Sequence, residues 1–143
     1  MQYHPRYAGY EDKVRQSFSR QNLMQTISAE MASIEPGLCK ITAPILETQR
    51  QQHGFAHAGL TFAIGDSAAG YSAFSLMDEA AEVLTVEMKI NLLAPAAGES
   101  LIAIGRVVKP GRRLIVVSAE VFARNAGEDT LVALLQGTMI PTE

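Results

Sequence analysis

The chain of 143 residues is 48% hydrophobic and carries a formal net charge of −3. It is long enough for about one domain with an apolar core, and its Lys and Arg residues form no cluster suited to binding nucleic acid. The sequence has neither an apolar signal-peptide core nor a membrane span, and its single cysteine, Cys39, excludes an intramolecular disulfide. We therefore expect one soluble, cytoplasmic domain over residues 1–143, without nucleic-acid or membrane partners.

The first part of the chain is expected to hold one helix and a pair of strands. Residues 1–10 resemble a loose arm, and apolar residues four apart among helix formers favour a helix over residues 11–25. Residues 28–34 are assigned as a strand because Glu35-Pro36-Gly37 follows them. In that turn proline presets its φ and glycine accepts a positive φ. Residues 38–47 then return as a second strand with apolar side chains on one face.

A long helix is expected from about His57 to Met77, after a polar loop over residues 48–54. Its many glycines and alanines indicate that it packs closely against another surface. Asp66 is the only formally charged residue in this helix, and aspartate is a poor helix former away from the helix ends. A buried, unpaired carboxylate costs several kcal/mol or more. Asp66 therefore either faces solvent or has a function that compensates this cost.

Alternating apolar and polar residues predict four further strands, over residues 84–92, 100–108, 112–124 and 130–140, joined by turns with Pro or Gly. In the first, one face carries Leu84, Val86, Met88, Ile90 and Leu92, and the other carries Thr85, Glu87, Lys89 and Asn91. Helices do not alternate with these strands. We therefore expect an α+β fold in which an antiparallel sheet of about six strands surrounds one long central helix. Apolar residues on both faces of the later strands also predict a homo-oligomer.

Three patterns near the long helix could carry chemistry, but each has a simpler explanation. His53 and His57 are four residues apart, as some metal ligands are, yet the glutamate of the zinc-protease helix is missing between them. Structural roles for both are favoured, and no metal or other cofactor is expected. Ser67 follows no strand, and its surroundings lack the second glycine of a nucleophile elbow. Cys39 falls inside a predicted strand, where inert core packing is the usual role.

Positive charges gather at one predicted hairpin tip, Lys109-Pro110-Gly111-Arg112-Arg113. A solvated turn is the commoner role of such a segment. The alternative is a clamp for a phosphorylated ligand, because the guanidinium groups of Arg112 and Arg113 match the geometry of phosphate.

With these elements in place, residues 51–77 resemble the signature of PaaI-like acyl-CoA thioesterases of the hotdog-fold superfamily. That signature is a polar residue, then roughly Gly-x-x-His-Gly-Gly, then an acidic residue nine positions after the histidine. It corresponds here to Gln51, Gly54, His57-Ala58-Gly59 and Asp66. The stretch from Thr85 to Pro95, followed by Gly98, resembles the family strand after the helix. The resemblance covers about residues 20–140, with His-Ala-Gly in place of His-Gly-Gly.

The resemblance implies a catalytic centre that hydrolyses an acyl-CoA thioester to a carboxylic acid and free CoA. Asp66 corresponds to the carboxylate that activates water or attacks the carbonyl itself, and the Ala58 N–H at the helix N-terminus corresponds to the oxyanion donor. Gln51 corresponds to the residue that holds water or substrate, and Thr85 to an assisting hydroxyl. His57 corresponds to a supporting histidine.

For such a substrate, Gly59 is expected to contact it, and the charges of Arg112 and Arg113 would suit the phosphates of coenzyme A. The resemblance also implies that each active site lies between two subunits of a homodimer or a dimer of dimers. Two other functions remain open from the sequence. One is a protein that binds acyl-CoA without catalysis. The other is a hydratase or dehydratase, in which His53 or His57 would pair with Asp66.

Overall fold

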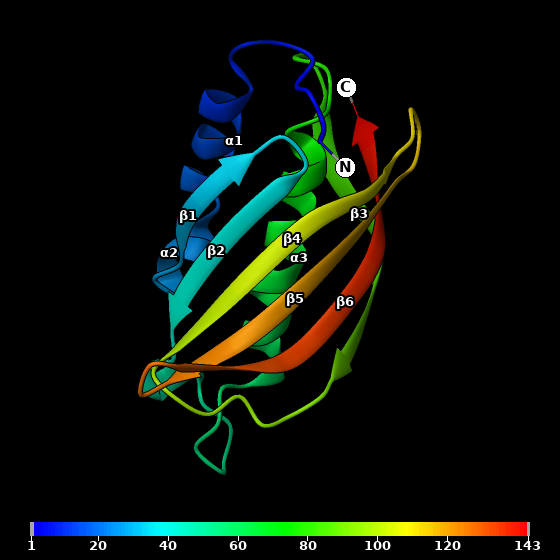
Figure 1. Ribbon diagram of the computed structural model, residues 1–143. Coiled ribbons are helices and arrows are strands. Elements are labelled where there is room, and N and C mark those ends of the chain that lie inside the picture. Colours follow the sequence, from blue (N-terminus) through cyan, green and yellow to red (C-terminus); the bar gives the residue numbers. More distant parts are fainter. Residues whose placement is uncertain (1, 143) are drawn as a thin grey trace.

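The computed structural model describes residues 2–142, and its main feature is one antiparallel sheet curved around a helix (Figure 1). The strands are β1 (Glu30–Glu35), β2 (Leu38–Pro44), β3 (Glu82–Leu92), β4 (Ser100–Pro110), β5 (Ile115–Asn125) and β6 (Glu128–Thr142). Their order across the sheet is β1-β2-β4-β5-β6-β3, so β1 and β3 are the edges. The predicted α+β fold with six antiparallel strands and one long central helix is confirmed.

The helix predicted over residues 11–25 is wrong in one respect, because the chain breaks it in two. Helix α1 covers Tyr10–Ser19 and helix α2 covers Asn22–Thr26. Between them Gln21 has an extended backbone, with φ −83° and ψ 98°. Its side-chain amide hydrogen-bonds to Tyr71 and Ser67 of the long helix, so a contact with a distant part of the chain accompanies the turn.

The long helix, α3, covers Ala58–Phe74 and is shorter than the predicted 57–77. His57 precedes it as the N-cap residue, with an extended backbone. At the other end, the Leu76 and Met77 N–H groups donate to carbonyls three residues back, at Ala73 and Phe74. Such bonds tighten the chain beyond the pitch of an α-helix and are common where a helix ends.

Small residues let α3 lie close against the sheet, as its composition predicts. A Cβ atom built on Gly105 of β4 would lie 2.2 Å from the carbonyl carbon of Ala68. One built on Gly65 would lie 2.9 Å from the Leu135 side chain on β6. The contact at Gly105 is with backbone atoms and leaves no room for a larger residue, whereas a larger residue at Gly65 would require the end of the Leu135 side chain to shift. The buried core therefore lies between α3 and the concave face of the sheet.

A β-bulge in edge strand β3 changes which side chains share a face. The register with β6 shifts between Thr85 and Glu87. Thr85 is paired with Met139, Met88 with Gly137 and Ile90 with Leu135. Since every second residue of β6 faces the same way, Thr85 lies on the same face as Met88 and Ile90. The strict alternation predicted for 84–92 is therefore wrong for Thr85, and the bulge turns this side chain toward α3.

No helix within residues 2–142 has the length and apolar character needed to cross a membrane.

Candidate active site

The Asp66 carboxylate lies half-buried in the middle of α3, beside the start of β3. The Thr85 hydroxyl donates a hydrogen bond to Asp66 Oδ1 at 2.9 Å. Burial raises the pKa of the Asp66 carboxyl above its ordinary value, and the hydrogen bond from Thr85 offsets part of this rise because it favours the charged form. A carboxylate with a raised pKa is a stronger base, as a general base in hydrolysis should be.

A pocket of about 190 Å³ opens beside Asp66, between α3, the start of β3 and the turn after α1. Ser17, Gln21 and Tyr71 line it. Tyr71 could be named from the sequence as a residue that shapes the pocket, whereas Ser17 and Gln21 could not. Tyr71 follows Ser67, another residue of the pocket wall, by four residues in α3, so helical spacing could have indicated that these two side chains lie close together. The break between α1 and α2 is what brings Gln21 to the pocket, and no local pattern in the sequence shows that break.

The N-terminus of α3 is capped by a histidine side chain. The Gly59 N–H donates to His57 Nδ1 at 2.8 Å, so the ring satisfies one of the helix N–H groups that lack an intrahelical acceptor. The Ala58 N–H has no acceptor within residues 2–142. The exposed Ala58 N–H is therefore available for a ligand oxygen, at the end of the helix where the dipole favours negative charge.

Gln51 lies in the loop before α3, with its side-chain orientation fixed by the backbone. Its Oε1 accepts from the His53 N–H at 2.5 Å and from the Phe55 N–H at 3.2 Å. The amide oxygen is thus engaged, and the NH₂ group is left to donate to other partners. Gln51 and Ala58 line a second pocket of about 480 Å³, which Leu92 at the end of β3 also borders.

A single chain keeps these two groups of residues apart. Ala58 and Asp66 are eight residues apart in one helix, which separates them by about 12 Å along its axis. A thioester carbonyl could not contact both groups at this distance. The structure therefore brings Asp66 and Thr85 together in one pocket, and Gln51 and Ala58 in another.

The remaining predicted residues lie outside both pockets. Arg112 and Arg113 are exposed at the tip between β4 and β5. Thr85 is in register with Met139, which is in register with Ile115 just after the tip. The tip therefore extends from the same end of the sheet as Asp66.

The histidines and the cysteine show no site of their own. His53 is exposed, and residues 2–142 contain no cluster of three or more metal-binding side chains. Cys39 is buried in β2, and burial raises its pKa to about 12. Its thiol therefore stays protonated and unreactive near neutral pH.

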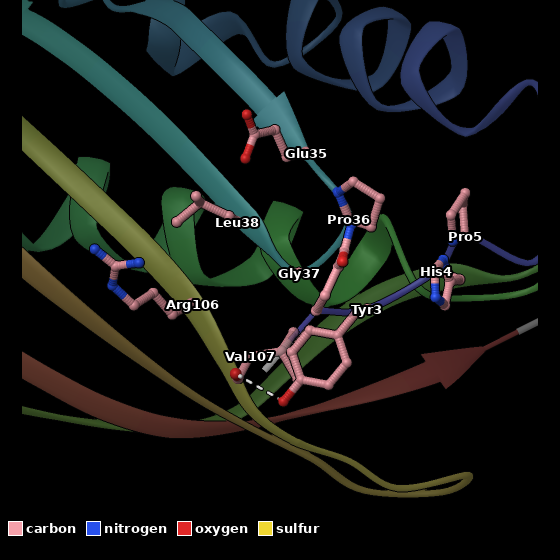
Figure 2. Close-up of a pocket in the computed structure, with 10 residues that line it drawn as sticks. Tyr3, His4, Pro5, Glu35, Pro36, Gly37, Leu38, Arg106 and Val107 are labelled. Carbon is pink, nitrogen blue, oxygen red and sulfur yellow. Dashed lines mark hydrogen bonds between the residues drawn. The ribbon is translucent and has the colours of Figure 1, made fainter.

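A larger hollow of about 830 Å³ lies elsewhere, where the N-terminal segment crosses the turn between β1 and β2 (Figure 2). There the Tyr3 ring lies against Gly37 and its hydroxyl donates to the Val107 carbonyl at 3.3 Å. The predicted arm over residues 1–10 thus makes contacts with the sheet in its described part. No predicted site residue lines this hollow, so its size does not identify it as the active site.

Comparisons with known proteins identify the family of this chain. The thioesterase superfamily matches residues 53–129, more than half of the chain. A thioesterase family protein from Silicibacter pomeroyi, with a crystal structure, is 46% identical and covers 93% of this chain and 98% of its own, with a TM-score of 0.92. A protein of Saccharolobus solfataricus, provisionally named an esterase, is 27% identical over 90% of this chain and 83% of its own length.

The fold is also that of the E. coli PaaI protein from the phenylacetic acid degradation operon. The two are 19% identical, with 94% of each chain covered and a TM-score of 0.84. Together with the sheet that surrounds α3, these matches show that the chain belongs to the thioesterase superfamily, has the hotdog fold and is a hydrolase of thioesters.

Proposed function

We propose that the protein hydrolyses acyl-CoA thioesters as a homodimer, in sites formed by two subunits. One observation carries this proposal: the two groups of site residues lie at opposite ends of the same edge strand. Thr85 and the Asp66 pocket are at the start of β3, whereas Leu92 and the pocket of Gln51 and Ala58 are at its end.

Pairing of β3 with its copy in a second subunit would join these groups. In an antiparallel pair, the start of one strand lies beside the end of the other. The Asp66 pocket of one subunit would then meet the Ala58 pocket of its partner. Edge strand β3 is suited to such pairing because Leu84, Val86 and Leu92 are 55%, 54% and 58% exposed. Unpaired apolar edges of this kind otherwise promote uncontrolled association. Two-fold symmetry would give each dimer two identical sites.

The chemistry follows from the charges that each group supplies. Asp66 accepts a proton from a water molecule whose oxygen attacks the thioester carbonyl carbon. The carbonyl oxygen becomes negative and accepts hydrogen bonds from the Ala58 N–H and the Gln51 NH₂ group. When the carbon–sulfur bond breaks, the proton held by Asp66 passes to the leaving thiolate. The products are a carboxylic acid and free CoA. In the alternative, Asp66 attacks the carbonyl directly and the carbon–sulfur bond breaks, which releases the CoA thiolate and leaves an anhydride. Water then hydrolyses the anhydride to the carboxylic acid, regenerates the Asp66 carboxylate and supplies the proton that the thiolate takes up.

The coenzyme A part of the substrate is assigned from charge. Arg112 and Arg113 extend from the same end of the sheet as Asp66, and two adjacent guanidinium groups suit the phosphates of a nucleotide. In this proposal the nucleotide lies on the subunit that supplies the carboxylate.

The Asp66→Asn variant tests the mechanism, with release of thiol from a panel of acyl-CoA esters as the measurement. We expect the variant to lose hydrolysis, while Asp78→Asn, which removes an exposed carboxylate after α3, keeps it. Burial raises the pKa of Asp66 in the folded state. At pH values above that pKa the charged Asp66 carboxylate therefore lowers the free energy of unfolding. The variant should therefore unfold at the same temperature as wild type or higher at pH 7. Undiminished hydrolysis would refute the role of Asp66. Binding of acyl-CoA without thiol release by wild type would favour a carrier or sensor instead.

A further inference from the structure

Two opposite charges lie close together on edge strand β3, and neither has a charged partner in its own chain. Glu87 and Lys89 are exposed and two residues apart. On β6 they are in register with the neutral residues Thr138 and Gln136. The Thr138 hydroxyl donates to Glu87 Oε1 at 2.7 Å, and neither Glu87 nor Lys89 forms an ion pair within residues 2–142. Both charges can therefore act on a strand that pairs with the outer side of β3.

The face of the sheet on which these charges lie limits how a second copy of β3 can pair. Thr138 and Gln136 alternate along β6 with buried residues that face α3, so Glu87 and Lys89 lie on the convex face. A two-fold axis perpendicular to a continuous sheet keeps each residue on the same face in both subunits. Residues directly opposite each other in an antiparallel pair also share a face. A convex residue of β3 must therefore oppose a convex residue of the partner strand, and the possible registers differ by steps of two residues.

Charge separates these registers from one another. If Glu87 opposes Glu87 of the partner subunit, or Lys89 opposes Lys89 of the partner subunit, like charges meet at the two-fold axis and weaken the pairing. If Glu87 opposes Lys89 of the partner subunit, symmetry supplies a second such pair, and the axis passes beside Met88. Each of the four charges then has only opposite charges as its nearest charged neighbours, along its own strand and across to the other.

The register of the two Glu87–Lys89 pairs also joins the two groups of site residues. Val86 is the extra residue of the β3 bulge, so counting along both strands from the charge pairs places Leu92 opposite Val83 of the partner subunit. Leu92 borders the pocket that contains the proposed oxyanion donor, and Val83 lines the pocket of the proposed base. Charge pairing and the assembly of the site are independent requirements, and both select this register.

Another register also opposes unlike charges, but it does not assemble a site. In that register Lys89 opposes Glu82 of the partner subunit, and Thr85 opposes its own copy. The two pockets with the proposed bases would then meet each other, and both oxyanion donors would lie outside the contact. The register of the Glu87–Lys89 pairs therefore satisfies both requirements where this one satisfies only the first.

We propose that Glu87 and Lys89 select a second copy of this chain as the partner of β3 and set the register of the pairing. They are positioning residues, because they lie on the convex face and act by setting where the Asp66 carboxylate of one subunit lies relative to the Ala58 N–H of the other. The inference rests on the proposed dimer with shared sites, and it names the contact that aligns those sites.

Reversal of each charge tests this contact. Glu87→Lys brings lysines together in both pairs, and Lys89→Glu brings glutamates together. Each variant should raise the Kd of the dimer about tenfold or more, as measured by sedimentation over a range of protein concentrations, and thiol release should fall in parallel. The double variant Glu87→Lys/Lys89→Glu has two pairs of opposite charges again, so it should regain both. Glu120→Lys is the matched control, because it makes the same change of charge on the interior strand β5 and should leave the Kd unchanged.

A mixture of the two single variants gives a sharper result. In a dimer of one Glu87→Lys subunit and one Lys89→Glu subunit, both cross-strand pairs have opposite charges. Each subunit also keeps every proposed site residue. Heterodimers and thiol release should therefore return on mixing, at a concentration where each variant alone is monomeric and inactive.

Cysteine cross-linking reports the register directly. Directly opposite residues have Cβ atoms about 4.5–5.5 Å apart and diagonal neighbours about 7–8 Å, so a disulfide forms readily only between opposite positions. Glu87→Cys and Lys89→Cys should each resist oxidation to a covalent dimer alone and form one when mixed. The native Cys39 is buried and does not compete.

The outcomes separate this inference from the proposed function. A covalent dimer of Glu87→Cys alone or of Lys89→Cys alone would overturn the register. Single reversals that leave the Kd unchanged, or a double reversal that restores nothing, would overturn the role of the charges; in both cases an active wild-type dimer leaves the proposed function standing. A wild type that is active as a monomer would instead refute the shared site of the proposed function, and this inference with it.

Discussion

Ala58→Pro removes the proposed oxyanion donor and leaves the helix intact. Ala58 is the first residue of α3, where an N–H has no intrahelical acceptor and proline is favoured. The preceding residue, His57, has φ −62° and ψ 141°, within the extended region that a residue before proline adopts. The substitution therefore deletes one hydrogen-bond donor without distorting the backbone, and the free energy of unfolding should not fall.

The expected loss of rate is large because the donor acts on charge that develops in the transition state. Removing one oxyanion donor typically lowers kcat by about 10²–10³, or about 2.7–4 kcal/mol. Thiol release under saturating acyl-CoA measures this loss directly. Ala58→Gly is the matched control, because it keeps the N–H and restores the His-Gly-Gly pattern of the family. It should keep the activity of wild type.

Two outcomes would contradict this reasoning. If Ala58→Pro folds, forms the same oligomer and keeps kcat within about threefold of wild type, the Ala58 N–H does not stabilise the oxyanion. If Ala58→Gly loses as much activity as Ala58→Pro, the alanine side chain and not the N–H is responsible.

Three further predictions concern Asp66, the edge strand and the arginine tip. Thr85→Val removes the hydrogen bond that lowers the pKa of Asp66, so the acid limb of the pH profile of kcat/KM should move to higher pH. An unchanged acid limb would show that Thr85 does not influence the catalytic base. Val86→Lys places positive charges of the two subunits close to each other across the proposed two-fold axis. Light scattering should then detect monomers, and activity should be lost with the dimer; an active monomer would contradict a shared site. Replacing Arg112 and Arg113 with Ala should raise KM for CoA esters more than for a thioester without the nucleotide, and equal effects would exclude the clamp.

The elements that depend on local pattern could be predicted from the sequence. Alternation of apolar and polar residues indicated the later strands, and Glu35-Pro36-Gly37 indicated the first hairpin. The small residues of α3 indicated its close packing, which Gly105 confirms from the opposite surface. These features depend on neighbours in sequence or on one residue's size, so the sequence contains the information directly.

The features that escaped prediction depend on distant partners. The break after α1 coincides with contacts between Gln21 and side chains of α3 that follow it by 46 and 50 positions. The bulge that turns Thr85 toward Asp66 depends on how β3 pairs with β6, a strand that is distant in the sequence. Neither has a local signature, so the family resemblance could indicate Thr85 but not the geometry that brings it to the carboxylate.

The two groups of site residues, Asp66 with Thr85 and Gln51 with Ala58, lie at opposite ends of β3, and in the proposed dimer this has a genetic consequence. In a mixed dimer of one Ala58→Pro subunit and one Asp66→Asn subunit, one site carries both substitutions and the other carries neither. Random exchange of subunits would restore about one quarter of the sites. Two preparations that are each inactive should therefore become active when they are unfolded and refolded together. The same pair of alleles should complement one another in a cell that expresses both.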